Sequence, residues 1–183
     1  SVIMNYYSTN RQAPLASLEE AVVKGLAGDK GLYMPERIPS LDAGTISHLK
    51  EKSFHEIACL VAQAFFGEDM EPAVLDRIVR DTLSFETPVV QVHDNIYSLE
   101  LFHGPTLAFK DVGARFMARL LGYFIQKEGI KEVNVLVATS GDTGSAVANG
   151  FLGVPGIHVY VLYPKGKVSP IQECQFTTLG QNI

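Results

Sequence analysis

The sequence predicts an α/β protein, with a helical region over residues 1–88 and the first part of an open, mostly parallel three-layer sheet over residues 89–183. Before Pro88, apolar residues recur at the three- and four-residue spacing of amphipathic helices. After Pro88 come short runs rich in β-branched residues, separated by turn residues and by helix-like segments. This alternation is typical of a parallel sheet covered by helices.

Three helices are predicted in the N-terminal region, each with a recognisable start. Ser17 and Ser53 are each followed three residues later by glutamate, the spacing of a capping box ahead of an apolar run. Pro72 stands where proline favours the first turn of a third helix. Residues 32–39 contain two prolines and predict a loop.

The second half predicts a hairpin over residues 89–101 that turns at residues 93–95. The elements expected after it are a helix over residues 112–125, a strand over 133–138, a helix from 145, a strand over 158–162 and a helix over 172–179. Residues 182–183 would begin another strand. A sheet that stops there has an unpaired edge, so we expect the chain to be an N-terminal fragment of a longer protein.

Lys110 stands where the turn-rich segment HGPTLAFKD, residues 103–111, enters the amphipathic helix. The positive end of the helix dipole disfavours an ammonium group at this place, which makes the neutral amine a usable nucleophile or base. A solvated lysine paired with Asp111 is the plainer alternative. Phe109, just before the helix, would form either the wall of a cofactor site or, as the pattern favours, part of the core.

Two smaller expectations concern the same helix. Asp111, Arg115 and Arg119 repeat at four-residue steps, which predicts a ladder of charges on the helix surface. Thr106 is expected to cap the N-terminus of the helix.

The segment TSGDTG, residues 139–144, follows a predicted strand and precedes small, helix-compatible residues. A turn of this kind offers backbone N–H groups and a helix dipole to an anion, and this one adds three hydroxyl groups. It is not a P-loop, because no Gly-Lys-Ser/Thr follows it. It is not the dinucleotide-binding fingerprint, because its glycine spacing is different. On its own it is equally compatible with a turn that binds nothing.

Four segments together resemble the threonine synthase family, whose members use pyridoxal 5′-phosphate (PLP) and have the tryptophan-synthase-β-like fold, PLP fold type II. These segments are GLYMP at residues 31–35, HGPTLAFKD at 103–111, TSGDTG at 139–144 and PKGKVSPIQ at 164–172. The resemblance covers essentially the whole chain. It also implies a longer protein, because family members are considerably longer.

The resemblance implies that Lys110 is the catalytic residue and holds the cofactor covalently, with Phe109 and Asp142 as further cofactor-binding residues. Relatives of this fold commonly have asparagine at the place of Asp142, against the 3′-oxygen of the cofactor, whereas aspartate is what threonine synthases show. The residues implied for the substrate carboxylate are Ser140, Gly141, Thr143 and Gly144.

The implied activity is the conversion of O-phospho-L-homoserine and water to L-threonine and phosphate. Two alternatives remain open: another enzyme of the same fold, such as a serine/threonine dehydratase or a cysteine-synthase-like enzyme, and a non-catalytic α/β binding module. Family members hold the cofactor phosphate in a Gly/Asn-rich loop that is not among these 183 residues. We therefore expect the fragment alone to bind PLP weakly and to be inactive.

Composition limits the other classes of function. A net charge of −5 without a basic run argues against nucleic acid and anionic membranes as partners. Cys59 and Cys174 form no CxxC pattern and suggest free thiols in a reducing compartment, so we expect a cytoplasmic protein. The five histidines lack the spacing of metal ligands, and we expect no metal site.

Overall fold

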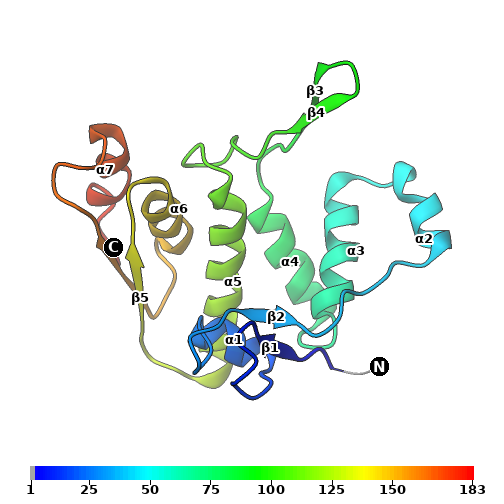
Figure 1. The fold of residues 1–183 in the computed structure, drawn as a ribbon, viewed down its shortest axis with the longest axis horizontal. Helices are drawn as coiled ribbons and strands as arrows, with labels where there is room; N and C mark the ends of the chain where they lie inside the picture. Colours follow the sequence, from blue (N-terminus) through cyan, green and yellow to red (C-terminus); the bar gives the residue numbers. More distant parts are fainter. Residues whose placement is uncertain (1–2) are drawn as a thin grey trace. The chain divides into compact units, whose positions relative to one another are not determined.

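The computed structural model describes residues 3–183 and divides into two compact units, one ending at Asp81 and the other beginning at Thr82 (Figure 1). The composition change at Pro88 falls inside the second unit. The first unit contains β1 (Tyr6–Ser8), α1 (Leu18–Lys24), β2 (Tyr33–Pro35), α2 (Ala43–Ser47), the 3₁₀ turn η1 (Leu49–Glu51), α3 (Phe54–Phe66) and α4 (Pro72–Thr82).

The predicted helix starts of the first unit are confirmed. The Ser17 hydroxyl accepts a hydrogen bond from the N–H of Glu20 at the start of α1. Ser53 and Glu56 form the complete reciprocal capping box of α3, and α4 begins at Pro72. The loop expected over residues 32–39 is wrong at residues 33–35, because these form β2, which pairs antiparallel with β1.

A carboxylate organises the turn that precedes β2. Asp29 accepts hydrogen bonds from the Ser8 hydroxyl at 2.6 Å and from the N–H groups of Gln12, Ala13 and Gly31 at 2.9–3.0 Å. These donors lower the pKa of Asp29 to about 2, with the Ser8 hydroxyl as the largest cause. One side chain therefore joins β1, the loop after it and the start of the GLYMP segment.

The second unit contains β3 (Val89–His93), β4 (Ile96–Leu99), α5 (Lys110–Glu128), β5 (Val133–Ala138), α6 (Asp142–Phe151), β6 (Ile157–Leu162) and α7 (Pro170–Thr177). The expected hairpin is confirmed as the antiparallel pair β3–β4. Strands β5 and β6 are parallel, with Val135 opposite Val159. The α/β class is thereby confirmed.

The core of the second unit lies along α5. Its buried residues include Leu120, Leu121, Phe124 and Ile125, which confirms the predicted apolar stripe. Helix α6 approaches α5 closely at Gly150, where an added Cβ would lie 3.1 Å from the backbone carbonyl of Ala114. The two helices are therefore in direct backbone contact at this point.

The last part of the chain differs from the prediction in two ways. Helix α7 begins at Pro170 rather than at residue 172, because Ser169 provides its N-cap and proline suits its first turn. Residues 182–183 form no strand. Instead, the Asn182 side chain donates to the carbonyls of Phe151 and Ile157 at 2.8 and 2.9 Å, which draws this segment into a turn.

Candidate active site

The start of α5 and the loop after β5 lie at the same end of the second unit (Figure 1). Helix α5 precedes β5 and runs antiparallel to it, so that its first turn and the carboxyl end of the strand are at the same end of the unit. The carboxyl ends of parallel strands are the usual place of ligand sites in α/β proteins. The structure thus brings Lys110 and the TSGDTG segment to one end of the sheet.

Lys110 is the first residue of α5 and its side chain is half-buried. Its Nζ lies 5.9 Å from the ring centroid of Phe109, and it forms no ion pair within residues 3–183. The alternative of a lysine paired with Asp111 is therefore wrong. Phe109 is 65% exposed, so its interpretation as a core residue is also wrong.

Asp111 is buried beneath the turn before α5 instead of lying on the helix surface. It is 1% exposed and accepts two hydrogen bonds from Thr106, from the hydroxyl at 2.6 Å and from the N–H at 2.9 Å. Thr106 is a donor here and does not cap α5, whose N-cap residue is Phe109. Arg115 reaches away from Asp111 to the carbonyl of Thr82 at 3.0 Å, so the predicted charge ladder is wrong.

The TSGDTG loop closes on the hydroxyl of Thr139, which was not singled out from the sequence. Thr139 Oγ1 accepts hydrogen bonds from the N–H groups of Gly141 and Gly144, at 2.9 and 2.8 Å. These two N–H groups are thus used inside the loop. A Cβ at Gly144 would collide with the Thr139 side chain, which makes glycine necessary for this turn.

The other hydroxyl and N–H groups of the loop are better placed to bind a ligand than the N–H groups of the two glycines. Asp142 begins α6, and the N–H groups of Asp142 and Thr143 belong to its first turn, where a helix has no internal acceptors for them. Ser140 and Asp142 are exposed and Thr143 is half-buried. This arrangement of hydroxyls and N–H groups at a helix N-terminus can bind a carboxylate.

Gln172, in the first turn of α7, contacts the same loop and was not predicted as a site residue. Its Nε2 donates a hydrogen bond to Asp142 Oδ1. The Ser145 hydroxyl lies within hydrogen-bonding distance of the Gly141 carbonyl at 3.0 Å and of the Gln172 carbonyl at 3.4 Å. The sequence signal for Gln172 was only its place at the end of the PKGKVSPIQ segment.

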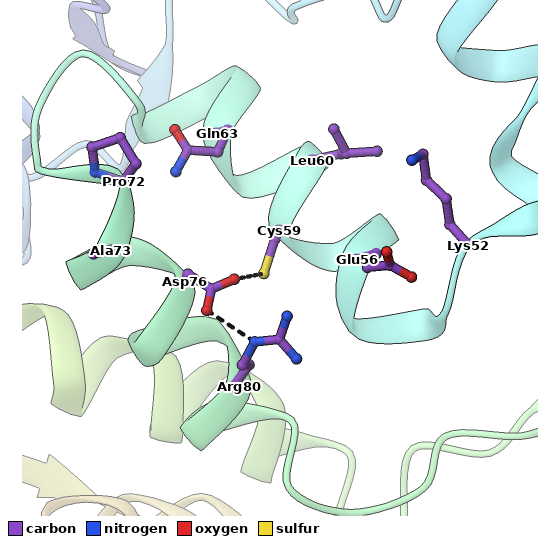
Figure 2. Close-up of a pocket in the computed structure, with 9 residues that line it drawn as sticks. All are labelled: Lys52, Glu56, Cys59, Leu60, Gln63, Pro72, Ala73, Asp76 and Arg80. Carbon is purple, nitrogen blue, oxygen red and sulfur yellow. Dashed lines mark hydrogen bonds and ion pairs between the residues drawn. The ribbon is translucent and has the colours of Figure 1, made fainter.

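The first unit contains a separate open pocket of about 590 Å³ between α3 and α4. Figure 2 shows that Cys59 and Asp76 point toward one another across it, with Sγ 3.0 Å from Asp76 Oδ1. Arg80 Nε pairs with the other oxygen of Asp76 at 2.9 Å. Burial and then Asp76 raise the pKa of Cys59 to about 11, so that the thiol is poorly suited to act as a nucleophile.

Among residues 3–183, no helix has both the length and the apolar character needed to cross a bilayer.

Comparison with known proteins finds threonine synthases that are similar to this chain over almost its whole length. Residues 5–83 match the family model of the threonine synthase N terminus. The threonine synthase of Haemophilus influenzae is 45% identical over 180 residues, which cover 98% of this chain and 41% of that protein. The threonine synthase of Saccharomyces cerevisiae is 40% identical, over 95% of this chain and 38% of its own length.

Solved structures give the same result. The PLP-bound threonine synthase of Brucella melitensis superposes with a TM-score of 0.87 at 40% identity, over 94% of this chain and 38% of that one. The Escherichia coli threonine synthase gives a TM-score of 0.87 at 42% identity, over 98% of this chain and 41% of that one. The chain spans about two fifths of the length of these relatives. In sequence and in fold, this chain is therefore similar to threonine synthases, and its residues 5–83 match their N terminus.

Proposed function

We propose that this chain carries the cofactor lysine, Lys110, of a PLP-dependent threonine synthase. The whole protein would convert O-phospho-L-homoserine and water to L-threonine and phosphate. The observation that carries the proposal is the placement of a lysine without an ion-pair partner, within the described residues, at the same end of the sheet as a hydroxyl-rich loop. The relatives compared above are named threonine synthases, and the Brucella protein is described as PLP-bound.

The residues present fit one side of PLP. The primary amine of Lys110 suits its aldehyde, and the exposed ring of Phe109 offers an apolar surface next to that amine. Asp142 would lie against the 3′-oxygen. These 183 residues contain no Gly/Asn-rich loop of the kind that holds the cofactor phosphate in family members. We therefore propose that this chain supplies the aldehyde and 3′-oxygen contacts, and that the phosphate is held by other residues.

When bound, PLP withdraws electrons from the Cα atom of an attached amino acid, which makes the Cα proton acidic. Lys110 Nζ would hold the cofactor covalently before the substrate binds. The Nζ released when the substrate amine replaces it would serve as the base that removes the Cα proton.

The substrate carboxylate would bind at the start of α6. Ser140 and Thr143 would donate their hydroxyl groups, and the first-turn N–H groups of Asp142 and Thr143 would complete the site. Gly141 and Gly144 would contribute differently from the sequence-based expectation. Their N–H groups bind Thr139, so their part is to keep the turn tight.

The partner we propose is thus a small phosphorylated amino acid rather than a macromolecule. The two cysteines are both free, which favours the reducing environment of the cytoplasm.

The test uses the full-length polypeptide. Borohydride reduction in the presence of PLP, followed by peptide mapping by mass spectrometry, is expected to place the phosphopyridoxyl group on Lys110. Lys110→Ala should lose this modification and lower phosphate release from O-phospho-L-homoserine by at least about 10²-fold. Lys131→Ala, which removes an exposed lysine after α5, is the control and should behave as wild type.

Modification of a different lysine would contradict the assignment of Lys110. Covalent PLP without phosphate release would favour a dehydratase or a cysteine-synthase-like enzyme instead. Absence of any modification would favour a binding module.

A further inference from the structure

We infer that Gln172 is a positioning residue that holds the Asp142 carboxylate in place for the cofactor. This inference rests on the proposed function, because it concerns the same site. The Gln172 side chain contacts the loop through Asp142, and it would act on the cofactor through that residue.

Both ends of the Gln172 amide form hydrogen bonds. Its Nε2 donates to Asp142 Oδ1, and its Oε1 accepts a hydrogen bond from the Ser169 hydroxyl at 3.2 Å. Reversing the amide would place its oxygen against Asp142 Oδ1, so the contact with Asp142 sets the orientation, whereas the Ser169 hydroxyl can donate or accept. Ser169 is also the N-cap of α7, so the cap and the amide support each other.

The loop makes room for this amide by having glycine at position 141. A Cβ there would lie 2.7 Å from Gln172 Cδ and 2.9 Å from Nε2, well inside van der Waals contact. Gly141 also has a φ of 150°, which side chains rarely adopt. The Ser145 hydroxyl adds a further link near the carbonyls of Gly141 and Gln172. The first turns of α6 and α7 are thus joined through both side chains and backbone.

This contact assigns different tasks to the two oxygens of Asp142. Oδ1 is occupied by Gln172, which would leave Oδ2 for the 3′-oxygen of the cofactor. Without Gln172, Asp142 would be free to rotate at the helix N-terminus and the charge next to the cofactor would no longer be fixed.

The experiment compares Gln172→Glu and Gln172→Leu in the full-length polypeptide with Gln175→Glu, the matched change on the same helix. Gln172→Glu replaces the donor by a second carboxylate, and Gln172→Leu removes the donor without adding charge. Both are expected to shift the visible absorption maximum of bound PLP and to weaken PLP binding at least about tenfold, whereas Gln175→Glu does neither. In steady-state kinetics, the loss should lie mainly in kcat rather than in KM.

Ser169 provides the second arm of the test. Ser169→Ala should reproduce part of the absorption shift, and Ser169→Thr, which keeps the hydroxyl, should restore the wild-type spectrum. Circular dichroism identifies any variant that fails to fold, and Gln172→Leu then serves in place of Gln172→Glu. Folded Gln172 variants with a wild-type spectrum and with PLP affinity within twofold of wild type would overturn the inference. If Lys110 were still modified by borohydride in those variants, the proposed function would stand.

Discussion

Thr106 and Asp111 close the segment that leads into α5, since both hydrogen-bond donors of Thr106 end on the Asp111 carboxylate. Gly104 packs on the same group, and a Cβ there would lie 2.7 Å from Asp111 Oδ2. Asp111 directly follows Lys110 in the sequence. The position of the proposed cofactor amine therefore depends on a buried carboxylate that does not itself face the ligand.

Thr106→Val is expected to lower the free energy of unfolding by about 2 kcal/mol, because it removes a buried donor to a charged group while keeping the side-chain shape. Thr177→Val removes an exposed hydroxyl that binds a helix carbonyl at 2.8 Å and should change stability by less than about 0.5 kcal/mol. Urea denaturation measures both variants. Equal losses would contradict the role given to Thr106.

Thr139→Val is expected to leave the N–H groups of Gly141 and Gly144 without their acceptor, at a cost of about 1–3 kcal/mol. Thr139→Ser keeps the hydroxyl and should retain most of the stability. Amide hydrogen exchange should become faster at both glycines in the valine variant alone. Unchanged exchange would show that the hydroxyl does not hold the loop.

Gly31→Ala is expected to destabilise the first unit by about 1–3 kcal/mol. The new Cβ would collide with the Ser8 hydroxyl and lie 2.9 Å from the backbone nitrogen of Asn10. Gly28→Ala is the control, because a Cβ at Gly28 meets nothing within 4 Å, and it should be neutral or slightly stabilising. Thermal unfolding of the two variants separates this steric effect from a general effect of losing glycine.

Asp29 makes stability depend on pH in the acid range. Its folded-state pKa is lowered from 3.8 to about 2, mainly by the Ser8 hydroxyl. Its stabilising contribution is therefore fully present above the ordinary value and is lost as the pH falls toward the lowered one. The stability difference between wild type and Asp29→Asn should shrink from about pH 5 to about pH 2. A difference that stays constant in urea titrations over this range would contradict the assignment.

Cys59 should react more slowly with thiol reagents than Cys174. Its pKa, raised from 9.0 to about 11, lowers the thiolate fraction near neutral pH by about a hundredfold, and Cys174 is exposed. Single-cysteine variants at mildly alkaline pH would show the order of labelling. Asp76→Asn should speed labelling of Cys59 only in part, because burial is the larger cause of the shift. Faster labelling of Cys59 than of Cys174 would exclude this account.

Local patterns in the sequence were sufficient for the elements that depend on nearby residues. The capping box of Ser53 and Glu56 and the strand at residues 133–138 were both predicted, because each is decided within one turn or one strand. Strands β1 and β2 were missed. Each has only three residues, and their pairing joins Tyr7 to Met34 across the intervening α1.

The site was predictable in its position but not in its internal contacts. Lys110 and the TSGDTG loop could be placed from the order of strand, turn and helix. The use of Thr139 as an acceptor depends on the exact path of the turn, and the contact of Gln172 with Asp142 depends on how α7 returns to α6. Charged residues at four-residue spacing suggested a surface ladder, yet the burial of Asp111 is a tertiary effect that helix spacing does not reveal.

The backbone contact between Gly150 and Ala114 lies one helical turn from Lys110. Because no side chain stands between the two helices there, neither can slide or tilt by repacking a compressible group. The distance from the Lys110 amine at the start of α5 to the hydroxyl groups at the start of α6 is thus set by the backbone. Adaptation of this end of the second unit to a ligand of different size would therefore require changes in the loop side chains, because the backbone contact between the two helices leaves no room for them to move closer together.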